Sequence, residues 1–282
     1  MDIAIRNMVE ADIPVAVEIF QSAFNVSENK SREIQRILTL QPEAFFAATF
    51  HDAPAGMVEA VDYGPFAYVG MMAVHPKFQR RGIGHALMRH LLTWLDARGT
   101  PASLLDATEL GAPVYAHFGF VECDQACVFQ RHDAAHAFHP PQGVHPLQPQ
   151  EIQAVCDFDT PIFGADRSNV LRALLADYAD RAFLVRDEAG QVSGYALAQS
   201  RRIGPWAARR PEDAQALLQA ALSLPYDGIP TVIAPKANSA AVELLEQFGF
   251  QFVRSNRHMR RGGTGTLSQR ALIYGQTSFA LG

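Results

Sequence analysis

The chain has few cysteines, no long apolar run and no excess of positive charge. Cys123, Cys127 and Cys156 are the only thiols in 282 residues, which argues against a disulfide framework and favours buried thiols that act as small apolar residues. No apolar run approaches the roughly 20 residues that span a bilayer. The net charge of -5 and the pI near 6.0 exclude the basic surface expected of a nucleic-acid-binding protein.

The remaining composition is that of a globular protein with an ample core, because 48% of the residues are apolar and 19% are charged. A length of 282 residues predicts two domains. The alternating start at residues 1–6 lacks the regions of a signal peptide, which predicts a cytoplasmic protein. His132, His136 and His139 have a ligand-like spacing but lie in a connector without supporting residues, so we expect no metal. A homodimer is left open.

The stretch from Tyr68 to Asp96 organises the chain. An apolar strand ends at His75-Pro76, and a turn with the sequence Gln-Arg-Arg-Gly-Ile-Gly follows at residues 79–84. From Ile83 the apolar residues recur at helical spacing, which predicts an amphipathic helix directly after the turn. The order strand, turn and helix is therefore expected.

The turn has the properties of a phosphate site. The first amides of a helix have no intrahelical partner and lie at the positive end of its dipole. Gly82 and Gly84 leave the backbone accessible, and Arg80 and Arg81 add positive charge. The turn lacks the lysine and hydroxyl of the Gly-x-x-x-x-Gly-Lys-Ser/Thr loop, and it lacks the third glycine of the Gly-x-Gly-x-x-Gly dinucleotide fingerprint.

The turn also resembles the acetyl-coenzyme A signature of the GNAT-type N-acetyltransferases, Gln/Arg-x-x-Gly-x-Gly/Ala, with Val74-His75-Pro76 before it and Ala86-Leu87 after it. In that family the turn amides hold the pyrophosphate, and a bulged strand before the turn pairs with the pantetheine arm. The resemblance implies acetyl-CoA as cofactor. The implied cofactor-binding residues are Met72, Ala73, Val74, Gln79, Arg80, Arg81, Gly82, Ile83, Gly84 and His85.

Periodicity predicts the other elements of the first half, residues 1–131. The expected strands are 3–8, 45–50, 56–61, 67–74, 103–107 and 120–130, and the expected helices begin at residues 12, 31, 83 and 112. This order matches the GNAT-type fold. We therefore expect an α/β (α+β) class with a mixed, largely antiparallel central sheet flanked by helices.

A proline-containing connector at residues 132–148 marks a domain boundary, and residues 149–282, the second half, repeat the same succession. The repeat predicts two tandem GNAT-like domains, the second of them degenerate. Where the first half has its phosphate turn, the second has Pro211, Glu212 and Asp213. Proline lacks an amide hydrogen and the acidic pair repels an anion, so we expect no cofactor in the second half.

The pattern Tyr-x-x-x-Gly-Phe supplies the candidate general acid. In GNAT-type enzymes such a tyrosine protonates the departing thiolate, and the match here is Tyr115 before Gly119-Phe120, whereas Leu245 stands before Gly249-Phe250 in the second half. The reference pKa values of a phenol and a thiol, about 10 and 8.5, make this transfer nearly balanced.

The amine that attacks the thioester must lose a proton. Glu59 is our candidate base, and Asp106 and Glu109 are alternatives, because all three flank the cofactor strand in the predicted order. The polarising hydrogen bond is expected from the backbone amide near Ala73 or Val74.

The sequences around Asp157-Phe158-Asp159 and Phe163–Arg167 resemble the C-terminal domain of bacterial tandem GNAT-type proteins. Asp159, Asp166 and Arg167 are therefore candidate acceptor-binding residues, with helix caps and ion pairs as the alternative. The expected function is acetyl transfer from acetyl-CoA to a primary amine of a small molecule or peptide. The alternative is a non-catalytic acetyl-CoA sensor that docks a protein partner through its second half.

Overall fold

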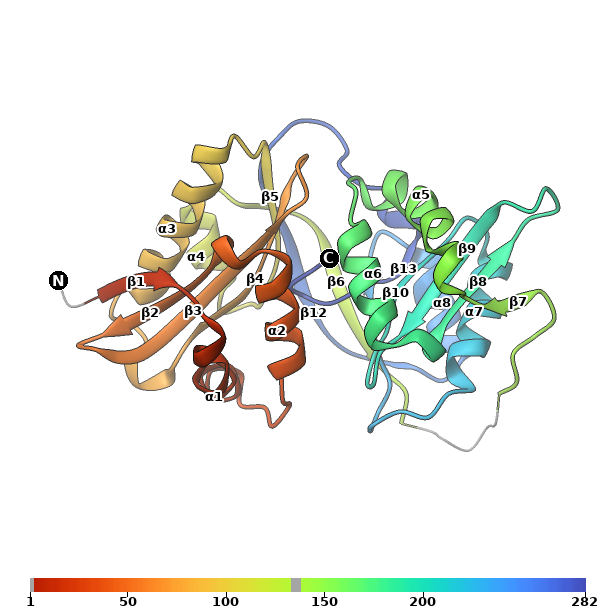
Figure 1. Cartoon of the computed structure of the whole chain (residues 1–282), viewed down its shortest axis with the longest axis horizontal. Helices are drawn as coiled ribbons and strands as arrows, with labels where there is room; N and C mark the ends of the chain where they lie inside the picture. Colours follow the sequence, from red (N-terminus) through yellow and green to blue (C-terminus); the bar gives the residue numbers. More distant parts are fainter. Residues whose placement is uncertain (1–2, 133–137) are drawn as a thin grey trace.

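The structure is a computed structural model that describes residues 3–132 and 138–282. The first half contains β1 (Ile3–Asn7), α1 (Ile13–Phe24), α2 (Ser31–Leu40), β2 (Phe45–Phe50), β3 (Ala53–Asp62), β4 (Ala67–Val74), α3 (Ile83–Arg98), β5 (Ala102–Ala107), α4 (Ala112–His117) and β6 (Val121–Gln130). These elements confirm the predicted succession. They also confirm the α/β class, with two largely antiparallel sheets flanked by helices (Figure 1).

The rest of the chain contains β7 (Val144–Pro146), α5 (Ile152–Phe163), α6 (Ser168–Asp177), β8 (Ala182–Arg186), β9 (Val192–Ala198), β10 (Ile203–Ala208), α7 (Pro211–Leu222), β11 (Thr231–Pro235), α8 (Ser239–Gln247), β12 (Gln251–Gly262) and β13 (Ile273–Gly275). The sequence did not predict β7, which lies in the connector, or β13. Within the described residues, no helix combines the length and apolar character that a membrane crossing requires.

The closing strand of each half lies in the sheet region of the other half. The larger sheet has the order β1-β2-β3-β4-β5-β12-β6-β11, and the smaller has the order β13-β10-β9-β8-β7. β12 pairs with β5 from Arg257–Ala107 to Gly262–Ala102, and β6 pairs with β11 from Gln130–Thr231 to Ala126–Pro235. Figure 1 shows these two long strands side by side between the halves.

The apolar side chains of the exchanged strands explain why the exchange is stable. Met259 on β12 is 4% exposed and belongs to the core under α3, whereas Phe129 on β6 is 2% exposed and belongs to the core under α7 and α8. Burying such a side chain contributes roughly 1.5–3 kcal/mol. Each closing strand therefore completes the core of the opposite half, and residues 1–131 and 149–282 are joined through one shared sheet.

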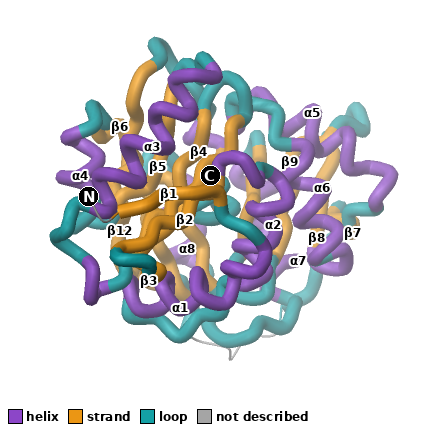
Figure 2. Tube along the Cα trace, turned by 60° about the vertical axis from the view of Figure 1, so that its left-hand side comes forward, coloured by secondary structure: helices purple, strands orange, loops and turns teal. Residues whose placement is uncertain are grey.

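A third core joins the two halves directly. It collects buried side chains of α1 and α2 together with those of α5 and α6, and Figure 2 shows α2 and α6 near one another at the junction. Arg36 on α2, which is 8% exposed, donates hydrogen bonds to Asp177 at the end of α6. Apolar packing and a hydrogen-bonded ion pair thus fix the halves against one another.

Candidate active site

The turn before α3 leaves a row of backbone amides free. Gly82 is the N-cap of α3 with φ of 82°, and Arg80 also has a positive φ of 59°. Within the described part of the chain, no amide from Arg80 to His85 donates a hydrogen bond. The amide nitrogen of the Gln79 side chain donates to the carbonyl of Val74 at 3.2 Å and ties the turn to β4. Such orphaned donors at a helix start fit an anionic ligand.

The two glycines of this turn differ in what their surroundings require. The left-handed conformation of Gly82 is one that other residues adopt at a cost of roughly 1–3 kcal/mol. An added Cβ at Gly84 would meet only the Cγ2 atom of Val74, at an ordinary contact distance of 3.8 Å, so the protein itself does not require glycine there, and the missing side chain leaves room beside the backbone. The residues present therefore fit a pyrophosphate that contacts the backbone.

β4 has the bulge that the resemblance implies. The register between β3 and β4 shifts between Met57–Ala73 and Glu59–Gly70, and Met71 has a positive φ of 45°. β4 and β5 run parallel and pair only at Ala67–Ser103 and Tyr68–Leu104. Beyond Tyr68 the two strands diverge, and in the described part of the chain no strand pairs with this edge of β4 from residue 69 to residue 74. This free edge includes Met72, Ala73 and Val74, the residues predicted to pair with pantetheine.

Tyr115 lies on α4 close to the start of α3. His85 at the turn contacts His117 and Phe118 of α4, with ring centroids 5.4 and 5.7 Å apart. Tyr115 itself is half-buried, and burial raises the pKa of its phenol. Among the described residues its hydroxyl has no hydrogen-bond partner. A neutral phenol with a free O–H can donate a proton, but the raised pKa makes Tyr115 a weaker acid than the reference values imply.

Glu59 is the most unusual polar group of the site. It is 0% exposed, and neither carboxyl oxygen has a hydrogen-bond partner among the residues that the structure describes. Burial, with a contribution from the negative charge of Glu33, raises the pKa of Glu59 well above its usual range. Burial alone would also raise the pKa of Glu33, but the charges of Lys30 and Arg202 lower it to about 2. An unpaired buried carboxyl costs stability and is retained at functional sites.

The two other candidate bases have different surroundings. Glu109 is exposed after β5, whereas the side chain of Asp106 is fully buried. Asp106 Oδ1 lies 2.8 Å from Nδ1 of His258, and its Oδ2 accepts from the Tyr68 hydroxyl at 2.6 Å. Although burial alone would raise it, the hydrogen bond and charge of His258 hold the pKa of Asp106 below its usual range. His258 could not be found from the sequence, because it reaches Asp106 on the exchanged strand β12.

The three predicted acceptor residues do not form one cluster. Asp159 and Arg167 are 1% and 3% exposed and make a two-pronged ion pair, with N–O distances of 2.7 and 2.8 Å. Arg167 also donates to Thr277 Oγ1 at 3.0 Å and to the Gly282 oxygen at 3.3 Å. Asp166 is exposed and accepts from the Ser168 amide at the start of α6. Direct contact of these three residues with an acceptor stays a prediction.

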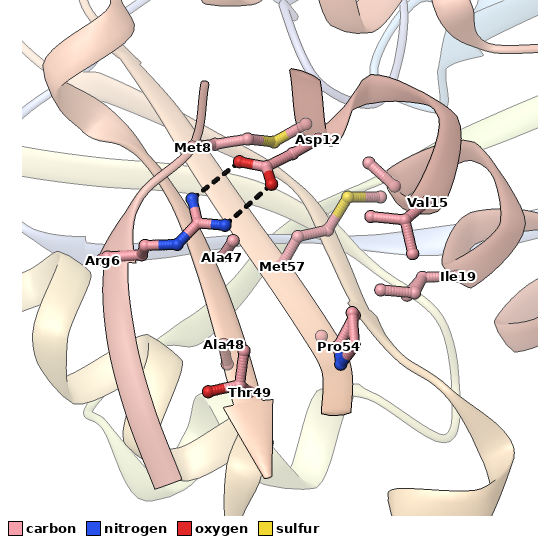
Figure 3. Close-up of a pocket in the computed structure, with 12 residues that line it drawn as sticks. Arg6, Met8, Asp12, Val15, Ile19, Ala47, Ala48, Thr49, Pro54 and Met57 are labelled. Carbon is pink, nitrogen blue, oxygen red and sulfur yellow. Dashed lines mark hydrogen bonds and ion pairs between the residues drawn. The ribbon is translucent and has the colours of Figure 1, made fainter. Parts of the chain in front are cut away.

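A small cavity lies under α1, between this helix and β1 to β3 (Figure 3). Arg6 and Asp12 form an ion pair beside it with both N–O distances at 2.7 Å, and the hydrogen bond from Arg6 lowers the pKa of Asp12. The cavity has about 30 Å³ of water-accessible space, which suits a single water molecule. It is too small for an amine acceptor, so we do not assign it to the site.

Histidine and cysteine do not build a metal centre in the described residues, where no three His, Cys, Asp or Glu side chains gather at ligand distance. The predicted grouping of His132, His136 and His139 includes one residue, His136, that lies outside the described residues. Cys123, Cys127 and Cys156 are free thiols.

Comparison with known proteins identifies the class to which this geometry belongs. Residues 13–120 match the acetyltransferase (GNAT) family, and residues 155–275 match an acetyltransferase (GNAT) domain. Together the two matches cover most of the chain, one in each half. The chain belongs to the GNAT acetyltransferase family and contains two such domains in tandem.

Individual relatives agree with this assignment. The chain is 25% identical over 197 residues to the N-acetyltransferase YitH of Bacillus subtilis, which covers 67% of each protein. It is 24% identical to the holothin acyltransferase of a Pseudoalteromonas species, over 82% of this chain and 79% of the relative. A crystal structure from Pyrococcus horikoshii, assigned as an acetyltransferase, has a TM-score of 0.89 and 28% identity over 100% of this chain and 96% of that one. A tandem GNAT protein of clavulanic acid biosynthesis shares the fold, with a TM-score of 0.62 and 14% identity over 94% of this chain and all of that one.

Proposed function

We propose that the first half binds acetyl-CoA and transfers its acetyl group to the primary amine of a small molecule or peptide. The observation that supports this most is the row of unpartnered amides from Arg80 to His85 at the start of α3. These amides would hold the pyrophosphate, and Arg80 and Arg81 are exposed beside it as counter-charges. Gln79 would support the turn through its bond to Val74. When bound, acetyl-CoA supplies an activated thioester.

The free edge of β4 would orient the thioester. Met72, Ala73 and Val74 offer backbone groups on the side that β5 leaves at the β4–β5 divergence. An amide near Ala73 or Val74 would donate to the acetyl carbonyl oxygen as negative charge develops there. Because this donor is a backbone group, no particular side chain is required for it.

Two side chains would move protons on opposite sides of the reaction. Glu59 in its ionised form would take a proton from the incoming ammonium group, and its raised pKa makes that carboxylate a stronger base than an ordinary one. Tyr115 would give its phenolic proton to the thiolate that leaves when the amine nitrogen takes the acetyl group. The amine nitrogen would lose its second proton to solvent, and solvent would return a proton to the phenolate of Tyr115.

Replacing Tyr115 with phenylalanine tests this assignment, because the substitution removes only the hydroxyl. We expect kcat to fall roughly a hundred-fold or more with acetyl-CoA affinity unchanged, since a general acid typically contributes 10²–10⁴ in rate. The measurement is thiol release over a panel of amines, polyamines, amino acids and aminoglycosides, with calorimetry for the cofactor. An unaltered kcat would remove Tyr115 from the reaction. Thiol release from none of these amines by the wild-type chain would instead favour the acetyl-CoA sensor.

A further inference from the structure

Two of the three candidate proton acceptors of the first half, Glu59 and Asp106, are covered by one segment of the second half. This covering segment, residues Gln276–Gly282, follows β13, and six of its seven residues are buried, Phe279 being the exception. The side chain of Gln276 donates to Asp106 Oδ2 at 2.9 Å and to the Tyr68 hydroxyl at 3.1 Å. Farther along, the Tyr63 hydroxyl donates to the carbonyl of Leu281 at 3.1 Å. The covering segment therefore touches β4, β5 and the loop after β3.

The covering segment approaches β4 most closely at Gly70. An added Cβ at Gly70 would lie 2.7 Å from Cβ of Ala280 and would also collide with Oε1 of Glu59. Glycine is thus required here because two other groups already occupy the space of a side chain. Gly70 immediately precedes the bulge residue Met71, so Ala280 and Glu59 meet beside the free edge of β4.

The covering segment is a compact turn that its own hydrogen bonds hold in shape. The Thr277 amide donates to the Gly282 oxygen at 2.7 Å, and the hydroxyl of Ser278 accepts from the Ala280 and Leu281 amides at 3.1 and 3.2 Å. The buried Arg167 holds both ends of the turn. Because these hydrogen bonds hold the covering segment in one conformation, the size of its side chains determines how much space is left beside it.

We propose that the covering segment is a wall of the acceptor site and that Ala280 is the residue that limits the size of the amine admitted beside Glu59. This inference rests on the proposed acetyl transfer, because only an amine at Glu59 would meet Ala280. Because Ala280 and Glu59 both lie against Gly70, the methyl group of Ala280 would restrict substituents on the carbon next to the amine nitrogen. The favoured acceptors are therefore unbranched primary amines, whose ammonium group can reach the unpaired carboxyl.

The test compares n-butylamine with sec-butylamine, which differ only in branching, as acceptors for the full chain. Ala280→Gly should raise the ratio of kcat/KM for sec-butylamine over n-butylamine about ten-fold, since one methyl group in a pocket changes selectivity by roughly 10–200-fold. Ala280→Val should lower kcat/KM for both amines at least about ten-fold and leave acetyl-CoA affinity unchanged. Thermal unfolding of each variant checks that it folds.

Phe279→Ala is the matched control. Phe279 lies on the same segment but is partly exposed and packs on Arg254, 5.2 Å from its ring centroid, away from Glu59. This variant should keep the wild-type ratio. A ratio that is unchanged in Ala280→Gly, or changed equally in Phe279→Ala, would overturn the inference and leave the proposed function standing. Absence of turnover by the wild-type chain with every amine, despite acetyl-CoA binding, would instead overturn the proposed function.

Discussion

The two halves differ most where two neighbouring central strands diverge, β4 and β5 in the first half and β10 and β11 in the second. In the first half, β4 and β5 pair at only two positions, and the edge of β4 beyond them is free. In the second half, the pairing between β10 and β11 that the described residues show is one bridge, between Arg202 just before β10 and Thr231, and β13 lies between the two strands. β13 pairs with β10 and is followed by Gln276, whose amide donates to the Ile233 carbonyl of β11 at 2.8 Å. The chain itself thus occupies in the second half the position that the cofactor would take in the first.

The starts of the helices that follow β4 and β10 also differ, because the first is open to an anion and the second is not. α3 begins at a left-handed glycine with free amides, whereas α7 begins at Pro211. Asp213, in the first turn of α7, accepts two hydrogen bonds from Arg210 at 2.8 and 2.9 Å and is 7% exposed. A carboxylate held at the positive end of the helix takes the role of the anion. The comparison indicates that the fold is kept without a ligand when groups of the chain itself, here β13 and Asp213, take the places that the ligand would occupy.

The largest effect is expected at Gly82. Gly82→Val places a β-branched side chain in a left-handed conformation against the phosphate turn, and acetyl-CoA affinity should fall by more than about a hundred-fold. Gly99→Val is the matched control, because Gly99 ends the same helix with φ of 73° and equally open surroundings. Calorimetry with acetyl-CoA measures both. Equal affinity in the two variants would contradict the assignment of the turn.

Replacing Arg167 tests whether the buried ion pair of the second half stabilises the fold. Arg167→Met leaves Asp159 buried without its partner, so the free energy of unfolding should fall by about 3–5 kcal/mol. Arg261→Met removes a solvent-exposed pair with Asp96 and should cost about 0–1 kcal/mol. Urea unfolding measures both changes. A loss no greater in Arg167→Met than in Arg261→Met would show that the buried pair does not stabilise the fold.

Glu59 should destabilise the fold progressively as pH rises. Its pKa is higher in the folded than in the unfolded chain, so the folded state binds more protons between the unfolded pKa near 4.5 and the raised folded pKa. Across that window the free energy of unfolding falls with a slope of up to about 1.4 kcal/mol per pH unit from this group. Glu59→Gln lacks this slope, and its stability advantage over the wild type should be larger at pH 7.5 than at pH 5. A pH-independent difference in urea unfolding would place Glu59 in contact with water or a cation.

No effect is expected when the helix start of the second half is opened. Combining Pro211→Gly with Asp213→Asn restores an amide and removes a charge, but β13 still fills the space between β10 and β11. The stoichiometry of acetyl-CoA should therefore remain at one per chain, as for the wild type. Titration calorimetry decides this. Two molecules bound by either chain would show that the second half retains a cofactor site.

Local features of the site could be predicted from sequence because neighbouring residues encode them. The glycines and arginines of the turn, the helix from Ile83 and the Tyr115 pattern all lie within one short stretch or at a fixed spacing. The burial of Glu59 could not be predicted, because its neighbour Ala280 is more than 200 residues away along the chain. The pairing of Asp106 with His258 was hidden for the same reason.

The sequence by itself determined the elements, the repeat of one fold and the half that carries the phosphate turn, because periodicity, glycine and charge act over a few residues. Only the tertiary structure decided that β6 and β12 exchange places, that β13 pairs with β10, and that residues 276–282 pack beside Glu59 and Asp106. Strand pairing depends on which apolar faces meet, and the two similar halves offer each closing strand two comparable edges. The choice between those edges is made by the packing of the whole chain.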